Sequence, residues 1–339
     1  MKLRLNIIQL SLLSFLFLLN VNLSSQENQK VFEEIIVTAE KRDESLQTIS
    51  QAVTAITESE IDDKNITSFV DLTSIVPGVT VAKNEGYKTV ISIRGVGNET
   101  NQNAIAAPSV AYHMDGVFIA SPFSLQTDFV DIERIEVLRG PQGTLFGQNS
   151  TGGAINVISK KPSTSAFSSN ASMTIGDFNL RKVSSSTNFP ISDSVATKFT
   201  FTSTERDGFS KNVVTGQDLD DASNISLRSD WIFELNDTSS LRIFGQYFDS
   251  DRNGAAMRGI DDANDSMRKL SQDSLSKQEL TSKVIALIYE SDLGYASLKI
   301  LGSIQEDDVL VVRDNDRHNY GDPVLAIPGL GADSTYQMA

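Results

Sequence analysis

The chain after Ser163 alternates apolar and polar side chains, and this pattern restricts it to an antiparallel sheet with one apolar face. The clearest example runs from Ile225 to Leu235. Its apolar face holds Ile225, Leu227, Trp231, Phe233 and Leu235, and its polar face holds Ser226, Arg228, Asp230 and Glu234, interrupted by Ile232. Residues 167–175, 195–202 and 296–305 repeat the alternation. A soluble sandwich and a membrane barrel both have such sheets.

The lengths of the connections favour the barrel. We count about seven strands, each near the ~9–11 residues that cross a bilayer at a tilt. Short turns at residues 190–193, 236–238 and 291–294 alternate with longer polar loops at residues 206–221 and 250–278. Transmembrane barrels have short periplasmic turns and long external loops, although the connection at 176–179 is a short one on the external side.

Composition excludes several functions. The formal net charge of -15 argues against nucleic-acid binding, and the absence of cysteine excludes thiolate chemistry. With only His113 and His318, no catalytic or metal-binding set emerges, so we predict neither an enzyme nor a metal or cofactor site. Asp249–Gly254 matches the start of a calcium loop, but Ile260 stands where the bidentate Glu belongs. Solvated loop tips therefore explain the acidic clusters better than a cation site.

The N-terminus has the features of a secretory signal peptide over residues 1–25. Lys2 and Arg4 precede an apolar stretch from Leu5 to Leu19, and small residues follow at Ser24 and Ser25. The alternative is a single membrane anchor, for which this stretch is short and polar.

Residues 26–43 form a polar tail around a short strand-forming segment. Ile35–Thr38 has high β propensity between charged neighbours, so it can add as a strand to the sheet of another protein. The alternative is that it forms the first strand of the domain that follows.

Residues 44–162 combine helix and strand signals, which predicts a compact α+β domain. Thr57–Glu60 fits a capping box, and Thr67 can cap a second helix that ends at Pro77–Gly78. The segment 90–95 predicts a strand that ends in glycine. Strands at 110–114 and 117–119 flank Asp115–Gly116, a two-residue hairpin signal.

The domain ends in a strand, a glycine-rich turn system and a second strand, from Ile132 to Pro162. This stretch closely resembles the end of the plug domain of TonB-dependent outer-membrane receptors. The ISIRG strand at 91–95 and the YHMDG hairpin at 112–116 precede it in the order found in that family. The matching motif residues are Arg94, Gly95, Asp115, Gly116, Arg139, Gly140, Pro141, Gly143, Gly147, Gly152 and Gly153.

The resemblance implies a plug at residues 44–162 and a transmembrane barrel from residue 163 to 339. Plugged transporters of this kind have about 22 strands. The chain supplies about seven, so we expect an incomplete barrel and a fragment of a longer protein or a disrupted reading frame.

The resemblance also implies energised uptake of a scarce solute across the outer membrane of a Gram-negative bacterium, most often an iron–siderophore complex. The segment 33–39 is similar to the TonB box, which pairs with an inner-membrane energising protein. Its residues are Glu34, Ile35, Ile36, Val37, Thr38 and Ala39. We expect the plug loops that face outward to contact the solute, through Asn98, Asn101, Gln102, Asn103, Phe123 and Gln126. The alternative function is a secreted or surface β-rich adhesion protein.

Overall fold

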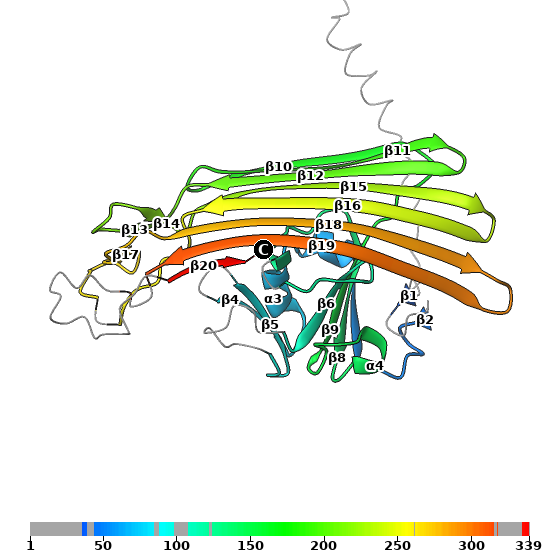
Figure 1. The fold of residues 1–339 in the computed structure, drawn as a ribbon, viewed down its shortest axis with the longest axis horizontal. Helices are drawn as coiled ribbons and strands as arrows, with labels where there is room; N and C mark the ends of the chain where they lie inside the picture. The colour runs from blue at the N-terminus through cyan, green and yellow to red at the C-terminus, as the bar shows by residue number, and fades with distance from the viewer. Residues whose placement is uncertain are drawn as a thin grey trace, which may run out of the picture. The chain divides into compact units, whose positions relative to one another are not determined.

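The computed structural model describes residues 36–38, 44–84, 88–97, 108–121, 124–260, 262–314, 317 and 334–338. The predicted signal peptide, residues 1–25, lies outside the described residues. The described chain forms a globular α+β domain up to Pro162 and a sheet of long antiparallel strands after it (Figure 1). None of the helices in these residues has the length and hydropathy needed to span a membrane.

A five-stranded sheet forms the centre of the globular domain. Its strands are β3 (Val53–Thr57), β6 (Val110–Met114), β7 (Val117–Phe118), β8 (Ile132–Arg139) and β9 (Gly153–Ser159), in the order β3-β8-β9-β6-β7. β6 and β9 run parallel and the other pairs run antiparallel. A separate hairpin joins β4 (Val79–Asn84) to β5 (Lys88–Ile93). All residues of β9 are buried, as expected for a strand near the middle of a covered sheet.

The predicted capping box is confirmed at the first helix, α2 (Glu58–Asp63). The backbone N–H of Glu60 donates to the Thr57 hydroxyl at 3.5 Å, and the Glu60 carboxylate accepts from the backbone N–H of Thr57 at 3.2 Å. This exchange satisfies two of the donors that a helix start leaves open.

The second helix differs from the prediction at its start. It begins as a 3-10 turn, η1 (Phe69–Asp71), and continues as α3 (Leu72–Ile75), with Ser68 rather than Thr67 as the N-cap. The Asp71 carboxylate accepts from the backbone N–H groups of both Thr67 and Ser68 at 2.9 Å. Asp71 is the third residue after Ser68 and forms a capping box with it, so the helix starts one residue later than predicted.

Glycine and a left-handed Asp shape the tight turns. The β6–β7 hairpin turns at Asp115 and Gly116, with φ of 53° and 85°, as the Asp-Gly signal predicts. The glycine-rich turn before β9 contains a short helix that the sequence did not predict, α4 (Gly143–Phe146). At Gly153, φ is 148° and a Cβ atom would lie 2.2 Å from the Leu138 carbonyl oxygen, so only glycine fits.

The long sheet confirms the predicted antiparallel alternation. Its order is β10-β11-β12-β15-β16-β18-β19-β20. The strands are β10 (Ser168–Gly176), β11 (Leu180–Ser192), β12 (Val195–Arg206), β15 (Ala222–Asn236), β16 (Ser239–Arg252), β18 (Lys277–Asp292), β19 (Ser297–Arg313) and β20 (Ser334–Met338).

Most of these strands are longer than the ~9–11 residues that a bilayer crossing requires. β15 has 15 residues and β19 has 17. The additional pairs lie at polar positions, such as Asp251 opposite Glu279, where neighbouring strands still satisfy each other's backbone groups. The hydrogen-bonded ladder therefore continues beyond the apolar band.

The two faces of the long sheet have opposite chemistry. Leu227 of β15 lies between Phe201 of β12 and Tyr247 of β16 on the apolar face. Arg228, one residue later, lies beside Gln246 on the other face. Ile232 interrupts the polar face as expected and is buried there.

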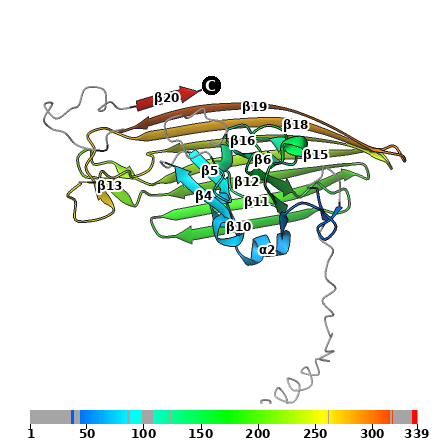
Figure 2. The same cartoon turned by 90° about the horizontal axis from the view of Figure 1, so that it is seen from below.

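Short turns at residues 193–194, 237–238 and 293–296 connect the strands at one end, as predicted. At the other end the two predicted polar loops contain a small sheet of β13 (Ser210–Asn212), β14 (Asp218–Leu219) and β17 (Lys269–Leu270) (Figures 1 and 2). Leu219 of β14 and Leu270 of β17 are buried, so these loops are more ordered than the prediction of plain polar loops.

The globular domain shares one apolar core with the long sheet. Phe69, Tyr112 and Ile155 of the domain belong to the same buried cluster as Phe244, Val284 and Ile288 of the sheet. Phe69 packs edge-on against Tyr112 with ring centroids 4.7 Å apart. An apolar patch on the otherwise polar face of the sheet is therefore the surface on which the domain is seated.

Candidate functional site

The predicted solute-contact residues are only partly described. Asn98, Asn101, Gln102, Asn103 and Phe123 lie outside the described residues.

Gln126 belongs to a short 3-10 turn, η2 (Ser124–Gln126), at the surface of the domain. Its side-chain oxygen accepts a hydrogen bond from Arg252 of β16, and the Ser124 hydroxyl donates to Asp307 of β19 at 2.8 Å. In this structure Gln126 thus attaches the domain to the ends of the long strands.

The glycine-rich motif residues shape the backbone of the domain. Arg94 and Gly95 form a turn with φ of 54° and 79°, and Gly140 and Gly147 also have positive φ. A Cβ atom on Gly152 would lie 2.9 Å from the Val96 carbonyl oxygen, so this glycine lets two turns touch.

The remaining motif residues surround the same turns. Arg139 donates to the Thr54 hydroxyl at 2.7 Å, which ties the end of β8 to β3. Pro141 lies between Gly140 and α4, and Gly143 is the first residue of that helix. These motif residues therefore have local structural roles in the turns.

The segment that matched the start of a calcium loop belongs mostly to a strand. Asp249 and Asp251 lie in β16, and the Thr281 hydroxyl donates to Asp249 at 2.8 Å. Across the residues that the structure describes, no group of three or more His, Asp or Glu side chains is arranged to hold a metal ion.

Asp115 of the hairpin turn anchors the domain to the long sheet. Its carboxylate is buried and accepts from the backbone N–H of Ser159 at 3.0 Å and from Arg228 Nη2 of β15 at 2.6 Å. The left-handed conformation of Asp115 places the carboxylate at the tip of the hairpin, where it meets the sheet.

A second carboxylate completes this ionic cluster. Asp230 accepts from Arg242 Nη2 at 2.6 Å and from Arg228 Nη2 at 3.0 Å, while Arg242 Nη2 also donates to the Ser159 hydroxyl at 2.8 Å. The Arg228 guanidinium lies 4.1 Å from the centroid of the Phe244 ring. Two arginines and two aspartates thus neutralise each other, which lets charged groups stay buried.

The charges in this cluster decide the protonation state of Asp115. Burial by itself raises the pKa of a carboxyl group, but Arg242 and Arg228, with the hydrogen bond from Ser159, lower the pKa of Asp115 to about 2. Asp115 therefore stays ionised at neutral pH and holds both arginines of this cluster.

Sequence reasoning found Arg228 and Asp230 only as members of a polar strand face, and it missed Arg242 and Ser159. The sequence did contain one signal for Arg242, because this arginine occupies a strand position on the same face as Asp230. The pairing with Asp115 spans 113 positions in the sequence, so it appears only when the domain is seated on the sheet.

The strand-forming segment of the tail is attached to the domain. β1 (Ile36–Val37) pairs antiparallel with β2 (Glu44–Ser45), a ladder of two residue pairs, and neither strand joins the five-stranded sheet. Val37 is buried in an apolar cluster with Leu138, Phe146 and three alanines. Glu34, Ile35 and Ala39 lie outside the described residues.

Glu136 of β8 holds the end of this segment. Its fully buried carboxylate accepts from the backbone N–H of Thr38 at 2.7 Å and from the Thr38 hydroxyl at 3.1 Å. Arg134 Nε donates to the same carboxylate at 2.9 Å. Hydrogen bonds to a charged acceptor are worth roughly 1.5–3 kcal/mol each, so this clamp outweighs the two-pair ladder.

A comparison with protein-family models independently supports the resemblance to a plug domain. Residues 45–154 match the model of the TonB-dependent Receptor Plug Domain. The pesticin receptor of Yersinia pestis is 32% identical over 144 residues, which cover 41% of this chain and 20% of that receptor. The vitamin B12 transporter of Vibrio vulnificus is 24% identical over 220 residues, covering 65% of this chain and 35% of the transporter.

Solved receptors share the fold. The ferric yersiniabactin uptake receptor of Yersinia pestis superimposes with a TM-score of 0.67 at 20% identity, over 77% of this chain and 42% of that receptor. The ferric-catecholate import receptor of E. coli gives 0.62 at 19% identity, over 86% and 44%. The chain thus spans about a fifth of the curated pesticin receptor and about two fifths of these solved receptors.

Acid should weaken the attachment of the domain to the sheet. A carboxylate whose pKa is lowered by folding stabilises the protein above its ordinary pKa, 3.8 for Asp115, and this contribution disappears as the pH falls through about 2. We expect Asp115 to contribute about 2 kcal/mol at pH 5 and almost none below pH 2, measured by urea unfolding of the full-length protein. The difference from the Asp115→Asn variant should shrink over that range, and a constant difference contradicts this role.

Removing the Glu136 carboxylate should release the tail segment. The chain has no cysteine, so Ile36→Cys gives a single attachment point for a nitroxide label. We expect an immobile electron paramagnetic resonance spectrum in the otherwise native protein and a mobile one with Glu136→Ala. Glu136→Gln should be intermediate because its amide oxygen can still accept from Thr38. Glu133→Ala, on the same strand, is the control, and equal spectra for Glu136→Ala and this control would refute the clamp.

Proposed function

This chain belongs to the TonB-dependent receptor family, and on that premise we propose that it serves energised uptake of an iron–siderophore complex across the outer membrane. The proposed organisation is a signal peptide at residues 1–25, a periplasmic tail at 26–43, a plug at 44–162 and barrel wall at 163–339.

The attached tail segment is the observation that carries this proposal. Within the described residues, β1 pairs only with the short strand β2, and Ile36 remains partly exposed. A strand held by so few backbone bonds can exchange one partner for another, which is how a strand adds to the edge of a foreign sheet. We propose that the inner-membrane energising protein captures it in this way.

Exposed and half-buried aromatic side chains support a membrane location for the long sheet. Phe167, Phe189, Phe199, Trp231 and Phe233 form a continuous row of ring contacts on its apolar face. Phe189, Phe199, Trp231 and Phe233 lie within seven residues of a short turn, near one end of the strands. Aromatic girdles at this level mark the lipid–water interface in membrane barrels.

The choice of solute rests on relatives alone. Receptors for ferric yersiniabactin, ferric catecholates and ferripyoverdine share the fold, and a vitamin B12 transporter shares part of the sequence. Iron–siderophore complexes are therefore the solute class that we propose first, ahead of cobalamin.

The proposed mechanism breaks no covalent bond of the solute. Solute binding at the external side weakens the Glu136–Thr38 clamp through the domain, and the tail moves into the periplasm. The energising partner then pulls on the tail. The ionic cluster of Asp115, Arg228, Asp230 and Arg242 keeps the domain seated until force arrives. The alternative of an adhesion protein explains neither the tail segment nor its clamp.

Deletion of Glu34–Ala39 from the full-length protein should abolish energised uptake and leave solute binding intact. Ile36→Pro should act similarly because proline lacks the N–H that strand pairing needs, and Ile36→Val is the matched control. Uptake of a panel of iron-55 siderophores by cells, beside binding to isolated outer membranes, separates the two steps. Uptake that persists without the segment contradicts its role as the coupling strand.

A further inference from the structure

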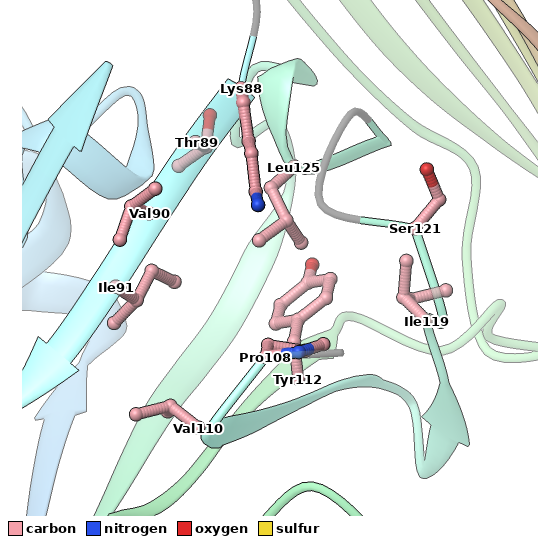
Figure 3. A pocket seen from close by; sticks show the side chains of 10 residues that line it. All are labelled: Lys88, Thr89, Val90, Ile91, Pro108, Val110, Tyr112, Ile119, Ser121 and Leu125. Atoms are coloured by element: carbon pink, nitrogen blue, oxygen red, sulfur yellow. The ribbon is translucent and has the colours of Figure 1, made fainter. Parts of the chain in front are cut away.

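A small cavity lies between the β4–β5 hairpin and the five-stranded sheet. Its volume is about 20 Å³, and its walls are mostly aliphatic, from Val90 and Ile91 of β5, Val110 of β6, and Ile119 and Leu125 (Figure 3). A cavity needs roughly 10–15 Å³ to hold one water-sized atom, so there is room for at least one such atom.

Two polar side chains from different sheets point into this cavity. Figure 3 shows the Lys88 ammonium of β5 and the Tyr112 hydroxyl of β6 directed toward the same space. Lys88 is 5% exposed and Tyr112 is 3% exposed. Neither Lys88 Nζ nor the Tyr112 hydroxyl has a hydrogen-bond partner among the described residues.

The unpaired lysine is costly in this position. An ionised amine out of water needs a counter-charge or hydrogen-bond acceptors, and burial accordingly lowers the pKa of Lys88. Burial raises the pKa of Tyr112, so its hydroxyl stays protonated and can donate. A negatively charged acceptor beside Lys88 would favour its ammonium form, so the two groups can act as donors together.

We propose that this cavity binds a single negatively charged acceptor atom, with Lys88 Nζ and the Tyr112 hydroxyl as its two donors. Two sources share this chemistry: a free halide-sized ion, and one anionic oxygen of an organic acid that reaches into the cavity. Because β5 and β6 belong to different sheets, the acceptor would bridge them where no backbone ladder does. The proposal does not rest on transport, since it is tested without solute or energising partner.

Crystals of the full-length protein soaked in sodium bromide test the site directly. We expect an anomalous peak between Lys88 Nζ and the Tyr112 hydroxyl in the native protein and none in Lys88→Met, whose side chain has similar length and no charge. The Tyr112→Phe variant keeps the lysine, and it should bind bromide at least about tenfold more weakly because one hydrogen bond to a charged acceptor is lost.

The rate of reductive methylation of Lys88, followed by peptide mass spectrometry, separates the two sources. Protection of Lys88 by bromide identifies a free halide-sized ion, and protection by acetate alone identifies an anionic oxygen. Lys64, an exposed lysine on the same domain, is the internal control and should react equally throughout. Absence of both the bromide peak and protection by either anion overturns the proposal and leaves a water-filled or empty cavity.

Discussion

The buried carboxylate of Asp115 is the interaction on which the arrangement of this molecule depends. It comes from a two-residue turn whose positive φ angles suit an Asp-Gly pair, and it reaches two arginines on neighbouring strands of the long sheet. Apolar packing around Phe244 and Val284 contributes buried area, but it does not fix the orientation of the domain. The ionic cluster fixes the orientation, because a buried charge has a low energy only where its partners are in place. The domain is therefore seated on the sheet in one position.

The same domain holds the tail by a different principle. Glu136 lies on β8, and the neighbouring strand β9 carries Ser159 of the ionic cluster. A single carboxylate holds Thr38, whereas two carboxylates and two guanidinium groups hold the domain itself. The tail attachment has fewer charged contacts, so we expect a pull to release the tail before the domain. This order is consistent with the proposed role of the tail as a coupling strand.

Local chemistry made much of this fold predictable. The Asp115–Gly116 turn, the Thr57 capping box and the alternation of β15 each depend on residues near one another in the sequence, and each is confirmed. The predictions failed where distant residues decide. The strands are longer than predicted because neighbouring strands continue to pair beyond the apolar band, and the polar loops contain a small sheet in which Leu219 and Leu270 are buried. The partners of Asp115 and Thr38 lie about a hundred residues away, beyond the reach of any periodicity.

The central claim is that Ile36–Thr38 is a releasable strand clamped to a domain that stays seated. Double electron–electron resonance between labels at Ile36→Cys and Asp237→Cys, on the turn between β15 and β16, measures both properties at once in the full-length protein. Without solute, the account predicts one narrow distance distribution. With a ferric siderophore that the cells take up, it predicts a broad, longer distribution, while a pair at Lys64→Cys, an exposed position on the same domain, and Asp237→Cys stays unchanged. A tail distance that does not respond to the siderophore would contradict the account.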